Sequence, residues 1–163
     1  MTLSARSRRA EIRALTPADT DAVLGVYREC EDFLALGPEP RVSPSMVLAD
    51  METSRREGGI FGGVYRRGKP IGIVDFIPNG FISLLMVARP FRGKGLGGAV
   101  VGLVEGRIQS GTVRTAVQVN NADGLRFWQK MGYRTVSEPE QQPDGTTTVR
   151  MEKRQAKGQK TRG

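Results

Sequence analysis

Apolar and polar residues alternate along this chain with two periods, which together predict a succession of strands and helices. Alternating or short apolar runs predict strands over residues 11–15, 60–65, 70–77, 81–87, 113–119, 133–137 and 146–151. Helical spacing predicts a helix after Thr16, a second around residues 46–51, a third over residues 96–108 and a short fourth over residues 125–131.

Local signals predict how these elements start and connect. Thr16, which is followed by a proline, can cap the first helix. The pair Asn79-Gly80 predicts a hairpin, because both residues tolerate positive φ. Gly102 and Gly106 weaken the third helix by about 1 kcal/mol each relative to alanine, so we expect them to pack closely on the sheet.

The order of the elements predicts the fold class. An antiparallel meander is followed by a helix that crosses over from residues 81–87 to residues 113–119, which gives a parallel βαβ unit. We therefore expect an α/β fold with a mixed, largely antiparallel central sheet and helices on both faces. One domain, residues 11–152, is expected between a basic flexible leader (1–10) and a basic flexible tail (153–163).

The net charge of +8 is concentrated near the chain ends. The residues concerned are Arg6, Arg8, Arg9, Lys153, Arg154, Lys157, Lys160 and Arg162. They equal the whole surplus, so the rest of the chain carries as many basic as acidic residues, 17 of each. We expect solvated tails and no nucleic-acid partner; the alternative is that the tails bind an acidic partner.

Cysteine and histidine counts limit the chemistry. The chain has one cysteine, Cys30, and no histidine, so we expect neither an intramolecular disulfide nor a metal site. Cys30 is interpreted as a small buried side chain, with a covalent acyl-cysteine as the alternative. No apolar run approaches 18 residues and no secretory signal is recognisable, so we expect no membrane contact and a cytoplasmic location.

The segment after residues 81–87 has the composition of a phosphate-binding loop. It reads Arg92-Gly93-Lys94-Gly95-Leu96-Gly97-Gly98. Glycines leave main-chain N–H groups accessible, the following helix contributes the positive end of its dipole, and Arg92 and Lys94 add full charges. The sequence therefore predicts a site for a phosphate-bearing ligand.

This loop has three alternative interpretations. It satisfies the dinucleotide fingerprint G-x-G-x-x-G, but residues 117–121 lack the acidic residue that would hold a ribose. The P-loop consensus does not occur in the sequence. A turn that only packs a helix onto a sheet would leave Arg92 and Lys94 without a role.

A second motif follows, in the order Asn121-x-x-Gly124-x-x-Phe127-Trp128-x-Lys130-x-Gly132-Tyr133. Together with the loop and the preceding Leu84-Leu85-Met86-Val87, it resembles the GCN5-related N-acetyltransferase (GNAT) family. The resemblance extends over roughly residues 11–153. It implies the acyl-CoA N-acyltransferase fold, with acetyl-CoA as co-substrate and no metal.

In that family the loop cradles the pyrophosphate of acetyl-CoA, the preceding strand pairs with the pantetheine arm, and the asparagine-containing helix closes the other side of the thioester. The resemblance thus implies coenzyme contacts from Met86, Val87, Arg92, Gly93, Lys94, Gly95, Leu96, Gly97, Gly98, Asn121, Phe127, Trp128 and Lys130. Asn121 could instead, or in addition, cap a helix. Lys130 either reaches a coenzyme phosphate or is simply exposed.

Several residues are candidates for the catalytic roles. The main-chain N–H of Val87 is the expected oxyanion donor, provided that the strand end is left unpaired. Trp128 stands where the family usually has a tyrosine that acts as the general acid. An indole N–H donates a hydrogen bond but keeps its proton, so Trp128 lines the pocket, holds the sulfur or packs in the core. Tyr133, Tyr27 or solvent could supply the proton instead.

Candidates for the general base and the acceptor site are acidic or hydroxylic. Ser83 could position a water, and Asp75 on the neighbouring strand faces either the pocket or solvent. Glu29, Glu31 and Asp32 form an acidic cluster at the end of the first helix, where relatives place the acceptor; the alternative is a solvated face.

The resemblance implies an N-acetyltransferase that moves an acetyl group from acetyl-CoA to a primary amine of a small molecule or peptide, by direct attack on the thioester. Two alternatives stay open: a transferase that uses a different acyl-CoA, and a non-catalytic acyl-CoA-binding or sensing module of the same fold. The protein is expected to be a monomer or a homodimer.

Overall fold

The structure of the protein, a computed structural model, describes residues 4–6, 10–37 and 41–156. The described strands form one sheet in the order β1-β2-β3-β4-β5-β6-β9-β7, with β8 paired to β9. They are β1 (Ser4–Arg6), β2 (Glu11–Ala14), β3 (Ile60–Arg66), β4 (Lys69–Ile77), β5 (Phe81–Val87), β6 (Thr112–Gln118), β7 (Arg134–Thr135), β8 (Glu140–Gln141) and β9 (Thr147–Arg154). β5 and β6 are parallel and the other pairs are antiparallel, so the expected mixed, largely antiparallel sheet is confirmed.

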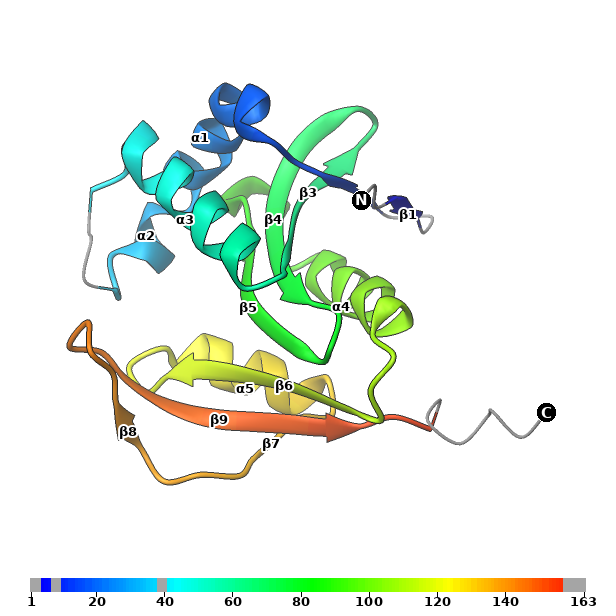
Figure 1. Cartoon of the computed structure of the whole chain (residues 1–163), viewed down its shortest axis with the longest axis vertical. Helices are drawn as coiled ribbons and strands as arrows, with labels where there is room; N and C mark the ends of the chain where they lie inside the picture. Colours follow the sequence, from blue (N-terminus) through cyan, green and yellow to red (C-terminus); the bar gives the residue numbers. More distant parts are fainter. Residues whose placement is uncertain (1–3, 7–9, 38–40, 157–163) are drawn as a thin grey trace.

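Helices cover both faces of this sheet, as predicted (Figure 1). They are η1 (Pro17–Asp19), α1 (Thr20–Glu29), α2 (Glu31–Leu34), α3 (Pro44–Arg56), η2 (Arg89–Phe91), α4 (Leu96–Arg107) and α5 (Ala122–Lys130). On one face α1 and α3 share a core with Phe61, Ile73 and Met86. On the other, α4 and α5 share a larger core with Val74 and Ile82. The alternation of β4, which sends Ile73 and Val74 to opposite faces, serves both cores.

The sheet divides between β5 and β6. Their register contains the pairs Phe81↔Arg114 and Ile82↔Thr115, at the beginning of β5. The buried Thr115 hydroxyl donates to Ile82 O at 2.8 Å and joins the strands at the point where they part. Beyond it β5 continues beside β4 and β6 continues beside β9. The second half of each strand therefore faces an opening.

The long elements match the prediction, including the hairpin at Asn79-Gly80, where Gly80 N–H donates to Ile77 O at 2.9 Å. The differences concern short or capped segments. The first helix begins with the 3-10 turn η1, because Thr16 and Asp19 form a reciprocal capping box. α5 begins earlier than predicted, β7 is shorter than predicted, and α2, β1 and β8 were not expected.

The expectation that Gly102 and Gly106 pack closely on the sheet is wrong. Both glycines are exposed, and a Cβ atom built at either position meets nothing within 4 Å. The buried positions of α4 are Leu96, Val100 and Val104 with their neighbours, so the two glycines lie on the opposite, solvent side.

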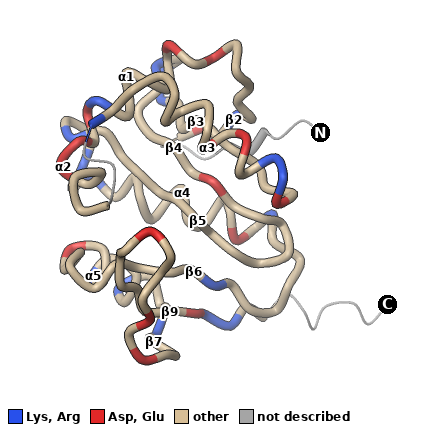
Figure 2. The backbone as a smooth tube through the Cα atoms, turned by 60° about the vertical axis from the view of Figure 1, so that its left-hand side comes forward, with Lys and Arg blue, Asp and Glu red and all other residues tan. Residues whose placement is uncertain are grey.

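The expected leader and tail overlap the sheet at their inner ends, since β1 pairs with β2 and β9 runs to Arg154. Arg8, Arg9, Lys157, Lys160 and Arg162 lie outside the described residues. Over the described chain, Figure 2 shows acidic and basic positions interspersed. Within that part of the chain, no helix is long and apolar enough to cross a bilayer, and no three acidic or cysteine side chains gather as metal ligands would.

Candidate active site

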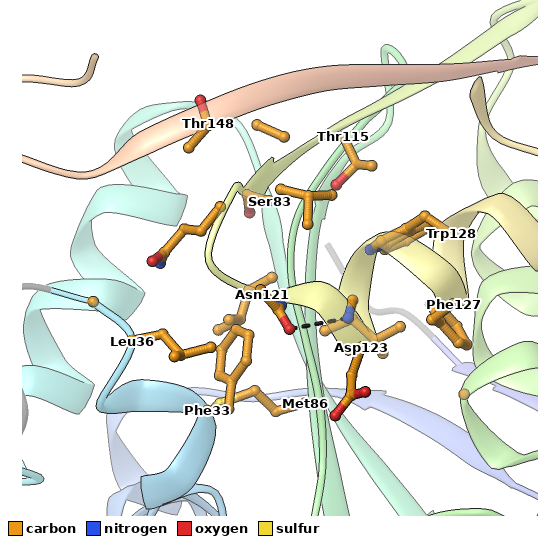
Figure 3. Close-up of a pocket in the computed structure, with 18 of the residues that line it drawn as sticks. Phe33, Leu36, Ser83, Met86, Thr115, Asn121, Asp123, Phe127, Trp128 and Thr148 are labelled. Atoms are coloured by element: carbon orange, nitrogen blue, oxygen red, sulfur yellow. Dashed lines mark hydrogen bonds between the residues drawn. The ribbon is translucent and has the colours of Figure 1, made fainter. Parts of the chain in front are cut away.

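A cleft of about 2340 Å³ occupies the opening between β5 and β6. Its walls come from β5 and β6 themselves, from the glycine loop and the start of α4, from α5, from α2 and α3, and from the β8–β9 hairpin. Figure 3 shows Ser83, Thr115 and Trp128 around this space, with Phe33 and Met86 on a second side. The motifs that lie far apart in the sequence thus meet in one place.

The glycine loop enters α4 in a conformation that its glycines permit. Gly93 and Gly95 have φ values of 75° and 78°, in the left-handed region that other residues rarely adopt. Gly95 is the N-cap of α4, and the first helical bond joins Ala99 N–H to Gly95 O at 3.1 Å. The N–H groups of the first helical turn, from Leu96 onward, have no partner within the helix. This end of α4 opens on the cleft, and free N–H groups at a helix N-terminus are the kind of group that binds anions.

Close contact between α4 and α5 requires Gly97. A Cβ atom at this position would lie 2.9 Å from Cε1 of Phe127. Gly98 similarly faces Met131, at 3.3 Å from its sulfur. Glycine at 97 therefore brings α5, with the second motif, against the end of the loop.

The guanidinium group of Arg92 is already engaged by protein acceptors. Its Nε donates to Val87 O at 2.7 Å, and its two Nη atoms donate to the Asp32 carboxylate at 2.6 and 3.1 Å. These hydrogen bonds lower the pKa of Asp32 to about 2. Arg92 thus joins the loop to α2, and part of its charge is neutralised there.

The two predicted lysines lie in different places. Lys94 is exposed and not part of the cleft wall; its Nζ lies 5.9 Å from the centre of the Phe91 ring. Lys130 is exposed at the end of α5 and does line the cleft. Of the two, Lys130 is the one placed to meet an anion in the cleft.

Asn121 is confirmed as a helix cap. Its Oδ1 accepts a hydrogen bond from Gly124 N–H at 2.9 Å (Figure 3), which starts α5 at the edge of the cleft. Its amide nitrogen is left for another partner. Both interpretations given for this residue therefore remain compatible.

The main chain of Val87 faces the opening. Ala88 N–H donates to Ile71 O on the β4 side, at 2.8 Å. Since successive N–H groups of a strand point to opposite sides, the Val87 N–H points away from β4. The Val87 carbonyl points the same way, toward Arg92. The strand end is thus left unpaired on the side of the cleft, and the oxyanion role of Val87 stays a prediction.

Trp128 combines both interpretations given for it. It is 7% exposed and packs edge-on against Phe127 and Tyr133, with ring centres 5.2 and 4.8 Å away. It also lines the cleft, with its indole nitrogen toward the middle of the space (Figure 3).

None of the three tyrosines lines the cleft, and the hydroxyls of two of them are bonded to carboxylates. Tyr133 donates to Glu105 at 2.8 Å, and Tyr27 to Asp50 at 2.6 Å. Burial raises the pKa of both phenols. Neither phenol is therefore well placed to give a proton to a leaving group.

The two candidates for the base differ in position. Ser83 is exposed and lines the cleft; its hydroxyl donates to Asp75 O at 3.1 Å. The Asp75 side chain turns toward α3, where it accepts from the Ser54 hydroxyl at 2.6 Å. It is not part of the cleft wall, and burial raises its pKa.

The residues of the acidic cluster at the end of α1 and the start of α2 lie in two different environments. Glu29 and Glu31 are exposed and lie outside the cleft wall, whereas Asp32 lines the cleft but is paired with Arg92. Cys30 is fully buried and not part of the wall, which confirms it as a small buried side chain.

Three residues of the cleft wall were not among the site residues predicted from the sequence. Asp50 lies on α3, Thr115 closes the point where the strands part, and Gln118 has a buried Oε1 without a hydrogen-bond partner among the described residues. Asp50 had a sequence signal: an acid within the apolar face of a helix, next to the buried Met51.

Comparison with known proteins agrees with this geometry. The family model described as an acetyltransferase (GNAT) domain matches residues 41–155. No curated protein matches the sequence. An acetyltransferase from Thermus thermophilus has a similar structure, with a TM-score of 0.76 and 19% identity over 93% of this chain and 99% of that chain.

Two further structures are similar in fold. A ribosomal-protein-alanine N-acetyltransferase from Brucella melitensis gives a TM-score of 0.64 and 21% identity, covering 88% of this chain and 98% of that chain. A spermidine N-acetyltransferase from Vibrio cholerae, in complex with CoA and spermine, gives 0.68 and 15% identity, covering 93% and 99%. At these identities the structures show the fold, while the family model spans most of the chain and includes both motifs. This chain belongs to the GNAT family of N-acetyltransferases.

Proposed function

We propose that this protein transfers an acetyl group from acetyl-CoA to a primary amine of a small molecule or peptide. One observation carries the proposal: β5 and β6 part directly beside a glycine-rich helix N-terminus. This opening presents anion-binding N–H groups and the strand N–H of Val87 to the same cleft.

The residues of the cleft fit a coenzyme with a diphosphate and an extended arm. Main-chain N–H groups at the start of α4 would bind the diphosphate, with Lys130 at the rim. The exposed edge of β5, ending at Met86 and Val87, would pair with the amide groups of the arm. The Asn121 amide nitrogen would donate to the arm from the opposite wall.

The thioester supplies an acyl carbon open to attack and a thiol leaving group. As the amine attacks, negative charge develops on the acyl oxygen, and the Val87 N–H would stabilise it. A thiol with a pKa of about 8.5 leaves without full protonation near neutral pH. The reaction therefore does not require a tyrosine where this chain has Trp128.

Similar structures suggest which amines to test first. One is named for spermidine and contains spermine, and another is named for the alanine of a ribosomal protein. A polyamine and a peptide N-terminus are accordingly the two acceptor classes in the assay. A different acyl group remains an alternative for the donor.

The experiment has a binding arm and a turnover arm. Calorimetry with CoA measures binding, and thiol release from acetyl-CoA is followed with spermidine and with peptides that begin in serine or alanine. Gly97→Ala should weaken CoA binding, whereas Gly102→Ala, in the same helix but facing solvent, should not. Absence of CoA binding by the unaltered protein would refute the proposal.

One observation favours a second candidate, a non-catalytic acyl-CoA-binding module: no tyrosine lines the cleft in the described part of the chain. That protein would bind CoA and release no thiol above the hydrolysis rate with any amine of the panel, or with propionyl-CoA in place of acetyl-CoA. Thiol release that depends on the amine supports the transferase.

A further inference from the structure

One face of α3 forms part of the cleft wall, and it places a carboxylate there. Met46, Asp50, Thr53 and Glu57, at the end of α3, follow helical spacing and all line the cleft. Asp50 is half-buried. Its Oδ2 accepts a hydrogen bond from the fully buried Tyr27 hydroxyl at 2.6 Å, so its orientation is fixed from α1.

The second carboxylate oxygen of Asp50, a residue of the cleft wall, is left without a hydrogen-bond partner among the described residues. Oδ1 has no hydrogen bond to any described residue and is not among the buried unpaired atoms. No Lys or Arg of the described chain is ion-paired with Asp50.

Five other carboxylates of the described chain line the cleft. Glu57 and Asp144 are exposed, and Asp144 accepts hydrogen bonds from Thr146. The other three are neutralised by arginines. Asp32 is paired with Arg92 at 2.6 Å, and Glu140 with Arg150 at 3.1 Å. Asp123 is paired with Arg126. Asp50, by contrast, is held by the Tyr27 hydroxyl, is half-buried and has no arginine partner, so it can accept a proton.

We propose that Asp50 is the proton acceptor of the reaction, and that its Oδ1 takes a proton from the ammonium group of the acceptor. This inference rests on the proposed function. The neutral amine then attacks the thioester carbon, so that a C–N bond forms and the C–S bond breaks. The second amine proton goes to the departing thiolate, and the proton on Asp50 returns to solvent.

The surroundings of Asp50 suit this role. Tyr27 from α1 is bonded to it, and Asp75 from β4 interacts with it electrostatically. Glu57 lies two turns further along the same face of α3, and β5 contributes the neutral Ser83 to the cleft wall. Burial raises the pKa of the Asp50 carboxyl, and the Tyr27 hydrogen bond opposes the rise. A higher pKa makes a carboxylate a stronger base at neutral pH.

The test compares Asp50→Asn with Glu52→Gln by thiol release, with the most active amine of the panel and over a range of pH. Glu52 lies on the same helix but is exposed and pairs with Arg55, so its substitution removes the same charge outside the cleft. Asp50→Asn should lower kcat about 10²- to 10⁴-fold and abolish the fall of kcat toward acid pH. Glu52→Gln should leave both unchanged, and Asp50→Glu should restore part of kcat.

Tyr27→Phe tests the role of Asp50 through the pH dependence of kcat, which would not change if Asp50 had only a structural role. It removes the hydrogen bond that stabilises the Asp50 carboxylate, so the acidic limb of the profile should shift to higher pH. A change in KM alone, or an unchanged acidic limb in Asp50→Asn, would overturn the assignment while leaving the proposed function intact. If the unaltered protein binds CoA but has no amine-dependent turnover, both proposals fall. Circular dichroism establishes that each variant is folded, and Asp50→Glu serves if Asp50→Asn is not.

Discussion

Three glycines of α4 should respond differently to the same substitution. Alanine at Gly102 or Gly106 adds a methyl group that meets nothing within 4 Å, so only the gain in helix propensity remains. That gain is about 0.8–1.0 kcal/mol per site. At Gly97 the same methyl group would lie 2.9 Å from Cε1 of Phe127, closer than atoms of this kind pack.

The double variant Gly102→Ala, Gly106→Ala should therefore raise the free energy of unfolding by about 2 kcal/mol. For a chain of this size that corresponds to a rise in Tm of roughly 4–8 °C. Gly97→Ala should instead lower stability by about 1–3 kcal/mol, because the Phe127 ring must move. Urea unfolding followed by circular dichroism measures both changes.

The comparison is internally controlled, because all three sites lie in one helix and receive the same methyl group. A stabilisation at Gly97 equal to that at Gly102 would contradict the contact with Phe127. No gain at Gly102 and Gly106 would contradict their solvent-facing position.

The remaining predictions concern single side chains of the cleft. Trp128→Phe should keep thiol release within about tenfold of the unaltered rate, since an indole does not give up its proton; a loss of several orders of magnitude in a folded variant would assign Trp128 a larger role. Asn121→Asp should keep the cap of α5, whereas Asn121→Ala should cost about 1 kcal/mol in urea unfolding. Both substitutions remove the amide nitrogen, so calorimetry should show weaker CoA binding for both. If Asn121→Asp bound CoA as tightly as the unaltered protein, capping α5 would be the sole role of Asn121. The Asp32–Arg92 pair should stabilise the fold at neutral pH and not in strong acid. The pKa of Asp32 is lowered from 3.8 to about 2 in the folded protein. The contribution of the pair to stability is therefore present above about pH 4 and is lost as the pH falls toward 2. Asp32→Asn should thus be less stable at pH 7, by no more than about 1 kcal/mol because the pair is partly exposed, and the two unfolding curves should converge near pH 2; a constant difference would refute the assignment.

The long elements and the conformation of the glycine loop could be predicted because their signals are local. The turn at Asn79-Gly80, the glycines at 93 and 95 and the cap at Asn121 each depend on the conformation of one or two residues. The parallel unit of β5, α4 and β6 followed from the order of the elements. Such features need no knowledge of distant parts of the chain.

The contacts among the charged residues of α1, α2 and α3 could not be predicted in this way. Arg92 meets Asp32 across 60 positions, and Tyr27 meets Asp50 across 23. These pairs depend on how α1, α2 and α3 sit on the sheet, which periodicity does not define. Short elements such as β8 were missed for a similar reason, since two residues carry no pattern.

The error at Gly102 and Gly106 was avoidable. Buried Val100, Val104 and Ile108 recur every four residues along α4, and the glycines fall midway between them. A helix with this phase directs the intermediate positions to solvent. The sequence thus contained the answer in the neighbouring apolar residues.

The parting of β5 and β6 gives the sheet a seam in its interior, whereas most sheets are weakest at their outer strands. Opening motions of the native protein should begin along this seam, and amide hydrogens in the second halves of β5 and β6 should exchange sooner than those of β3 and β4. A molecule seated in the seam touches both halves and would slow that exchange on each side at once. Ligand binding would then be detected as slower amide exchange in both halves of the sheet, which otherwise open independently.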